Sequence, residues 1–131
     1  MNVSSLIESA AAVRLLAYAP YSRFSVGAAL LTTDGRIFCG CNVENLSFGL
    51  TLCAERGALV AAIAKGCLTF SAIAIVADTD VPISPCGACR QVLAEFCPAL
   101  KIISANLKGL SETFSLVELL PRAKTGILNN P

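Results

Sequence analysis

The pattern of hydrophobic and polar positions predicts helices and strands that alternate along the chain. Apolar residues recur at helical spacing from about residue 6 to residue 17, with Ser4 or Ser5 as the candidate N-cap and Pro20 as the stop. The same spacing predicts helices over 53–64, 86–96 and 115–120. Runs of β-forming residues predict strands over 26–33, 36–41, 70–77 and 101–105, and a short one near Thr113.

The order of these elements predicts the architecture. Asp34-Gly35 between the first two strands is a strong hairpin signal, and the nearly continuous apolar run 70–77 is typical of a strand buried on both faces. Strands that alternate with helices after an initial hairpin favour a three-layer α/β/α sandwich with a mixed sheet. The chain has no repeat or linker, so we expect a single domain over 1–131, with 121–131 as an irregular tail.

Composition and charge exclude several classes of protein. The chain has 131 residues, of which 55% are hydrophobic and 15% charged, so it has ample apolar surface on which to fold. Its net charge of +1 argues against nucleic acid as a partner. Its apolar runs are too short to span a membrane, and its first residues lack the basic segment of a secretory signal. The surplus of apolar residues favours association of subunits.

The chain has seven cysteines and no histidine. An odd number of cysteines without a secretory signal argues against a disulfide framework and predicts a reducing, cytoplasmic setting. The absence of histidine excludes an imidazole as base or as metal ligand. Any metal site must therefore use thiolates or carboxylates.

Cys86 and Cys89 stand one helical turn apart, so both thiols can share a metal ion, although redox chemistry and simple packing fit this pair equally well. Cys53 favours metal, because it also begins a predicted helix, where the helix dipole stabilises a thiolate. Three thiolates leave one zinc position open, which is typical of a catalytic site. The remaining four cysteines are interpreted as small core residues: Cys39, Cys41, Cys67 and Cys97. Helix geometry also places Cys67 and Cys97 too far along their helices to reach the ion.

At this point the chain resembles a known family, the zinc-dependent cytidine deaminases in their small homotetrameric form. The resemblance rests on Cys53-Ala54-Glu55 and Pro85-Cys86-Gly87-Ala88-Cys89, which match the metal-binding segments of these enzymes. The segment 19–30 resembles the substrate segment of the family, and 40–45 resembles its ribose-binding segment. The resemblance implies a cytidine deaminase-like fold, one zinc ion per chain held by the three cysteines, and a homotetramer.

The activity that the resemblance implies is hydrolytic deamination of cytidine and deoxycytidine to uridine and deoxyuridine in pyrimidine salvage. Water attacks C4 of the ring, and zinc activates that water near neutral pH. A carboxyl group must take a proton from the water and pass it to the ring nitrogen and the leaving amine, and Glu55 is the candidate for this shuttle. Cys53 and Glu55 are two residues apart, so they converge only if the site lies at the mouth of the helix.

Two arginines follow the metal-binding segments. Three thiolates and one Zn²⁺ sum to −1, which weakens zinc as a Lewis acid, and an arginine that donates to sulfur draws charge back. In the family the position of Arg56 resembles such a group, and we hypothesise this role here. Arg90 fits either the same role or a surface salt bridge.

The resemblance also implies the substrate contacts. Asn42 and Glu44 share one side of an extended segment, and an amide with a carboxylate can bind a ribose hydroxyl. Phe24 is expected to stack on the pyrimidine. Backbone groups of Ala54 and Ser84 are expected at the edge of the base, by analogy with the family.

The chain departs from the family in two places. Phe48 stands where the family often has tyrosine, and the residues after Leu119-Leu120-Pro121 contain no aromatic that could reach a neighbouring site. Three alternatives therefore stay open: a deaminase of another aminopyrimidine nucleoside, a non-catalytic zinc-stabilised module, and a thiol redox protein. A polynucleotide-editing deaminase is disfavoured by the charge and by the small number of aromatic residues.

Overall fold

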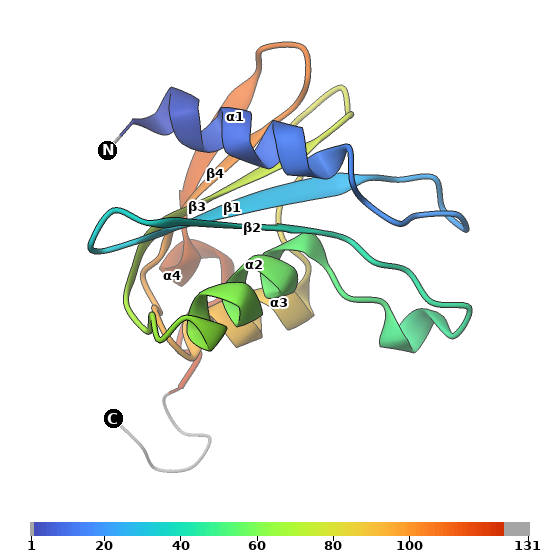
Figure 1. The fold of residues 1–131 in the computed structure, drawn as a ribbon. Coiled ribbons are helices and arrows are strands. Elements are labelled where there is room, and N and C mark those ends of the chain that lie inside the picture. Colours follow the sequence, from blue (N-terminus) through green and yellow to red (C-terminus); the bar gives the residue numbers. More distant parts are fainter. Residues whose placement is uncertain (1, 125–131) are drawn as a thin grey trace.

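The computed structural model describes residues 2–124, which form one five-stranded sheet with helices on both faces (Figure 1). The strands lie in the order β2-β1-β3-β4-β5, with α1 on one face and α2, α3 and α4 on the other. The strands are β1 (Val26–Thr32), β2 (Ile37–Cys41), β3 (Phe70–Ala77), β4 (Lys101–Ala105) and β5 (Ser111–Ser115). The helices are α1 (Val3–Arg14), α2 (Ala54–Ala64), α3 (Gly87–Ala94), α4 (Leu116–Leu119) and the 3-10 turn η1 (Phe48–Leu50).

The sheet is mixed, as the order of elements predicts. β1 pairs antiparallel with β2 and with β3, β3 pairs parallel with β4, and β4 pairs antiparallel with β5. The hairpin between β1 and β2 turns at Gly35, whose φ of 90° suits glycine. The crossover from β3 to β4 passes through α3, which is the usual way to join parallel strands.

Two hydrophobic cores lie on the two faces of the sheet. Along β3, Ile73 and Ile75 pack on the side of α2 and α3, whereas Ala74 and Val76 pack on the side of α1. Seven of the eight β3 residues are buried, and Ser71 is the exposed one. This confirms the prediction of a strand covered on both faces. Within the part of the chain that the structure describes, no helix is both long enough and apolar enough to cross a bilayer.

Helix α2 approaches strand β2 so closely that only glycine fits at the contact. A Cβ atom at Gly40 would lie 2.3 Å from the Ala58 nitrogen and 2.4 Å from the Ala54 carbonyl oxygen. These distances are far inside van der Waals contact, so any larger residue would push the helix away from the strand. Gly40 therefore sets the position of α2, at whose N-terminus Cys53 lies.

The first helix differs from the prediction at both ends. Asn2 is its N-cap, with the side-chain oxygen accepting from the Ser5 nitrogen at 3.0 Å, so the prediction of Ser4 or Ser5 was wrong. The helix ends at Arg14 because the residues that follow lead into a pairing with another segment of the chain. Tyr18 forms a parallel bridge with Val43, and this long-range pairing overrides the helical spacing. The expected irregular tail shows turns and bends at 121–124, and 125–131 lie outside the described residues.

Candidate active site

A cavity of about 330 Å³ opens where the N-termini of α2 and α3 meet the loops that follow β2 and β3. It brings together seven of the residues singled out in the sequence: Phe24, Asn42, Cys53, Ala54, Glu55, Ser84 and Cys86. Val26, Thr51 and Ile83 complete its lining. A second hollow of about 430 Å³ lies beside the N-terminus of α1, and none of the predicted site residues lines it.

Three cysteines form a cluster at one end of this cavity. Cys53 is the N-cap of α2 and Cys86 is the N-cap of α3, both with extended backbone, and Cys89 lies within the first turn of α3. Their sulfur atoms all lie within 4.8 Å of one another. We call these three residues the cysteine cluster. Helix N-termini carry partial positive charge, which favours the thiolate form that a metal requires.

Within the cysteine cluster, contacts from Cys89 and Arg56 favour the thiolate form of Cys53. A hydrogen bond from the Cys89 thiol and the adjacent Arg56 guanidinium lower the pKa of Cys53 to about 5, although burial opposes the shift. Arg56 Nη2 lies 3.3 Å from the Cys53 sulfur and 3.2 Å from the Thr51 carbonyl oxygen. The hydrogen bond to Cys53, followed by burial, raises the pKa of Cys89.

The donor set fits zinc. Two sulfurs bound to one tetrahedral zinc lie roughly 3.8 Å apart, given a Zn–S distance of about 2.3 Å. Sulfur atoms within 4.8 Å of one another need only small side-chain rotations to reach that geometry. The Arg56 contact supplies the charge compensation that three thiolates require. Among the described residues, this is the one group of three or more metal-binding side chains that converges in this way.

Glu55 is buried beside the cysteine cluster and lines the same cavity. It is the second residue of α2, so the site lies at the helix mouth, which is the condition under which Cys53 and Glu55 converge. Burial raises the pKa of the Glu55 carboxyl, and the charge of Cys53 raises it further. A carboxyl group with a raised pKa can both donate and accept a proton near neutral pH.

Asn42 and Glu44 are both buried and hold the segment that carries Phe24, and of the two only Asn42 lines the cavity. The Asn42 side chain accepts from the Val26 nitrogen at 2.8 Å and donates to the Phe24 carbonyl oxygen at 2.7 Å. Glu44 lies outside the cavity lining and accepts from the Ser22 hydroxyl and from the backbone nitrogens of Tyr21 and Ser22 at 3.0 and 3.1 Å. The Ser22 hydrogen bond lowers the pKa of Glu44.

Phe24 lies at the mouth of the cavity rather than in either core, with 40% of its surface exposed. The residue before it, Arg23, has a φ of 58°, which is uncommon for a residue with a side chain. Two hydrogen bonds stabilise this turn: the Asn42 amide donates to the Phe24 carbonyl oxygen, and the Phe24 nitrogen donates to the Ser22 hydroxyl at 3.0 Å. The ring is therefore held open to a ligand in the cavity.

Arg90 plays neither of the parts considered for it. Its guanidinium donates to the Pro85 carbonyl oxygen at 2.7 Å, to the Leu119 carbonyl oxygen at 3.0 Å and to the Ser84 hydroxyl at 3.1 Å. It therefore joins α4 to the entrance of α3. Its position in the sequence does not reveal these acceptors, because two of them are backbone atoms and one is far along the chain.

The other four cysteines lie outside the cysteine cluster. Cys67 is buried in the core, and Cys97 is half-buried with its sulfur 3.6 Å from the Phe70 carbonyl oxygen, as expected for packing residues. The core interpretation was wrong for Cys39, which is exposed because it lies on the edge strand β2. Cys41, on the same strand, is half-buried.

Comparisons with known proteins agree with this geometry. Residues 2–105 match the family model described as the cytidine and deoxycytidylate deaminase zinc-binding region. The chain is 51% identical to a cytidine deaminase of Sporosarcina psychrophila, over 94% of this chain and 91% of that protein. It is 53% identical to one of Halalkalibacterium halodurans, over 95% of this chain and 96% of that protein. A crystal structure of cytidine deaminase from Burkholderia pseudomallei superposes with a TM-score of 0.89 at 53% identity, covering 92% of this chain and 98% of that one.

Proposed function

This chain belongs to the family of zinc-dependent cytidine and deoxycytidylate deaminases, and from that premise we propose that it converts cytidine and deoxycytidine to uridine and deoxyuridine with release of ammonia. It is a zinc-dependent deaminase, and its fold is that of the cytidine deaminases. The observation that carries the proposal is the convergence of three thiols, of which Cys53 and Cys86 line the cavity, beside one buried carboxyl that lines the same cavity of nucleoside size.

Cys53, Cys86 and Cys89 are the residues that would hold the zinc ion. When bound, zinc supplies Lewis-acid activation of a water molecule near neutral pH. Arg56, through its hydrogen bond to Cys53, withdraws charge from the thiolates. The four residues thus provide a metal site whose net charge is balanced from within the chain.

Glu55 would move the protons. Its carboxylate takes a proton from the attacking water and delivers it to N3 of the pyrimidine. It then carries the remaining proton of the hydroxyl added at C4 to the amine, so that the C4–N bond breaks and ammonia leaves while a carbonyl forms at C4. Burial keeps bulk water away from this carboxyl, so the proton passes to the substrate and not to solvent. No other described carboxyl lines the cavity.

The opposite end of the cavity would bind the nucleoside. Phe24 would offer a ring face to the pyrimidine, and backbone groups of Ala54 and Ser84, which line the same cavity, would contact the edge of the base. Asn42 uses one of its two amide hydrogens on Phe24 and keeps the other for a ligand. The Glu44 carboxylate, with three hydrogen bonds accepted, keeps capacity for one more donor such as a ribose hydroxyl.

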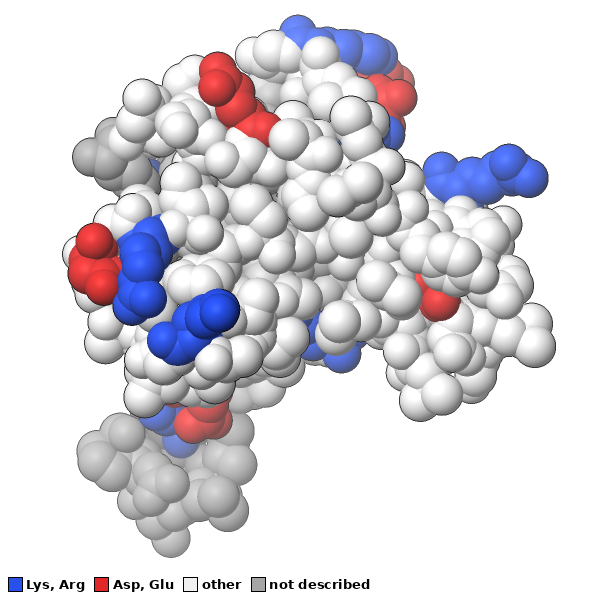
Figure 2. Space-filling view, viewed as in Figure 1, with Lys and Arg blue, Asp and Glu red and all other residues white. Residues whose placement is uncertain are grey.

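We further propose that the chain is one catalytic domain that assembles as a homotetramer. The segment 42–52 projects from the body as an arm, and Figure 2 shows that surface as almost free of charge. Leu46, Phe48 and Leu50 on this arm are 82%, 63% and 72% exposed, which is costly unless another subunit covers them. The mass in solution tests this: a tetramer is expected, and a monomer at micromolar concentration would contradict it.

We assign the reaction to pyrimidine salvage in the cytoplasm. The odd number of cysteines and the dependence of the site on reduced thiols both favour a reducing compartment. Localisation of the tagged full-length chain by microscopy or fractionation tests the compartment, and an extracytoplasmic location would contradict it.

The experiment that tests the function is zinc analysis of the purified protein together with the loss of ultraviolet absorbance as cytidine becomes uridine. We expect one zinc per chain and turnover of both cytidine and deoxycytidine. Turnover of a different aminopyrimidine nucleoside alone would favour the first alternative. Zinc without turnover of any of them would favour a zinc-stabilised module, and reversible oxidation of Cys86 and Cys89 in a zinc-free protein would favour redox chemistry.

A further inference from the structure

The loop between β3 and α3, residues 78–85, forms one wall of the cavity but has no regular secondary structure. It supplies Ile83 and Ser84 to the lining and leads directly into Cys86. Within it the Thr79 hydroxyl donates to the Val81 carbonyl oxygen, and most of its other hydrogen bonds come from outside the loop. Arg90 holds the end of the loop at Ser84 and Pro85, and the rest of the loop is held from the end of β4 and the residue after it.

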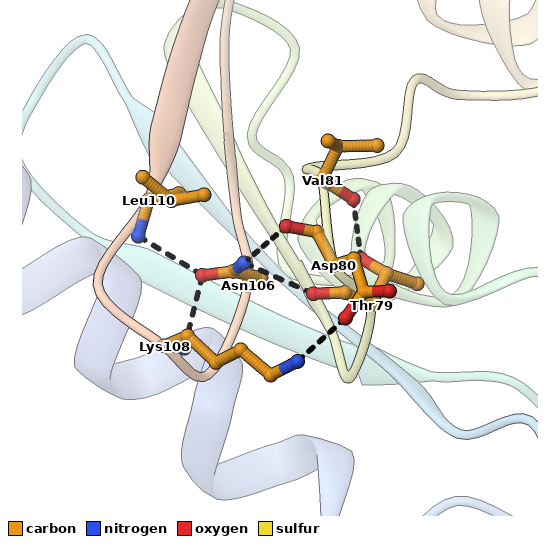
Figure 3. A network of polar contacts seen from close by, with 6 residues as sticks. All are labelled: Thr79, Asp80, Val81, Asn106, Lys108 and Leu110. Carbon is orange, nitrogen blue, oxygen red and sulfur yellow. Dashed lines mark hydrogen bonds and ion pairs between the residues drawn. The ribbon is translucent and has the colours of Figure 1, made fainter.

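Asn106, which follows β4, holds the first half of the loop (Figure 3). Its side-chain nitrogen donates to the Thr79 and Asp80 carbonyl oxygens at 2.9 and 3.0 Å. Its side-chain oxygen accepts from the Lys108 and Leu110 nitrogens, both at 2.9 Å. The amide thus makes all four hydrogen bonds available to it, and the residue is only 5% exposed.

Ser104, inside β4, holds the second half of the loop. Its side chain is completely buried, and its hydroxyl donates to the Ile83 carbonyl oxygen. That carbonyl belongs to the peptide that joins Ile83 to Ser84, and both residues face the cavity. The hydrogen bond therefore sets the orientation of the peptide immediately beside the expected position of the base.

From these contacts we propose that Ser104 and Asn106 are positioning residues for the nucleoside, acting through the wall 78–85 and touching neither zinc nor substrate. This inference rests on the proposed function. It follows from topology: β3 and β4 are parallel neighbours, so the residues at the end of β4 lie beside the loop that leaves β3. A polar side chain there can hydrogen-bond loop carbonyls that have no strand partner.

The two residues should affect binding of the base more than the chemical step. Helix α2, at whose N-terminus Cys53 and Glu55 lie, packs mainly against β1 and β2, and Arg90 independently holds Ser84 and Pro85 next to Cys86. Loss of a hydrogen bond to the wall should therefore leave the metal and the proton shuttle in place. The ion pair of Lys108 with Asp80 lies in the same network but is largely exposed, and it provides a matched control.

The test compares Ser104→Ala, Asn106→Asp and the control Lys108→Ala in the zinc-loaded full-length protein. Aspartate keeps the acceptor toward Lys108 and Leu110 but loses both donors to the loop. For Ser104→Ala and Asn106→Asp we expect KM for cytidine to rise about five-fold or more, the effect of losing one or more hydrogen bonds, with kcat within about two-fold. We expect zinc content to stay unchanged, faster amide exchange over 78–85, and wild-type values for Lys108→Ala.

The outcomes separate this inference from the function on which it rests. A wild-type protein that turns over no aminopyrimidine nucleoside would overturn the proposed function. A wild type active on cytidine, with unchanged KM in both Ser104→Ala and Asn106→Asp, would overturn the positioning role. Equal losses of kcat and zinc in these variants would also overturn it, because they would indicate a general structural role. If Ser104→Ala does not fold, Ser104→Thr, which keeps the hydroxyl, is expected to fold with a KM near that of wild type, and Asn106→Asp decides the test.

Discussion

The two ends of the cavity are built in different ways. The metal end consists of Cys53, Glu55, Cys86 and Cys89, which lie in two short sequence segments at the N-termini of two helices. The substrate end consists of loops, and their conformation depends on side chains that are distant in sequence, such as Glu44 binding Ser22 across 22 positions. The metal-binding and proton-transfer residues thus come from short segments of the sequence, whereas the shape of the substrate end depends on hydrogen bonds between residues far apart in the sequence.

Because of this difference, we expect mutations at the two ends of the cavity to have different effects. Replacing a ligand at the metal end removes the metal and with it the reaction. Replacing a residue at the substrate end changes affinity, because the reacting groups stay in place.

Cys89→Ser should abolish both zinc binding and activity. A serine hydroxyl does not ionise near neutral pH, so the cysteine cluster loses a ligand and kcat/KM should fall on the order of 10³-fold or more. Metal analysis and the absorbance assay measure the two effects. Cys39→Ser is the matched control, because Cys39 is exposed and outside the cysteine cluster, and it should keep full zinc and full activity. A fully active Cys89→Ser protein would contradict the assignment of the ligands.

Arg56→Gln should have an intermediate effect at the metal end. The hydrogen bond to Cys53 and the positive charge are lost, and zinc affinity or activity should fall roughly 10–100-fold. Without the cation, the anionic form of the site is less stable, so the acidic limb of the pH–rate profile should move to higher pH. Unchanged zinc affinity together with an unchanged profile would refute this role.

Phe24→Ala should change KM without loss of zinc. Stacking of one base on an aromatic ring contributes about 1–3 kcal/mol, so KM should rise on the order of ten-fold while kcat stays within a few-fold. Steady-state kinetics with cytidine provide the measurement, and Phe24→Tyr is the matched control with the ring retained. A fall in kcat with unchanged KM would place Phe24 in the chemical step instead.

The sequence predicts the metal end better than the substrate end, for physical reasons. Strand β3 has the predicted bounds because continuous burial leaves no competing structure, and the cysteines at helix starts follow from local capping geometry. The end of α1 is not predictable from its own residues, because Tyr18 pairs with Val43. The acceptors of Arg90 and the contacts of Ser104 and Asn106 with the wall 78–85 are also not predictable from the sequence, because each depends on tertiary packing.

The exposure of Cys39 shows the same limit at the edge of the sheet. Alternation places Cys39 and Cys41 on one face of a strand, but only the strand order places that strand at an edge, where one of the two thiols remains exposed. Local pattern predicts which residues share a face. It does not predict what covers that face.

Glu55→Gln in the zinc-loaded protein tests whether this site deaminates cytidine with Glu55 as the proton shuttle. Glutamine matches glutamate in shape but carries no titratable proton, so the metal should be retained while the proton shuttle is lost. We predict one zinc per chain, as in wild type, with kcat for cytidine lower by roughly 10²–10⁴-fold. A Glu55→Gln protein that keeps its zinc and deaminates cytidine at the wild-type rate would contradict the role of Glu55 as the proton shuttle.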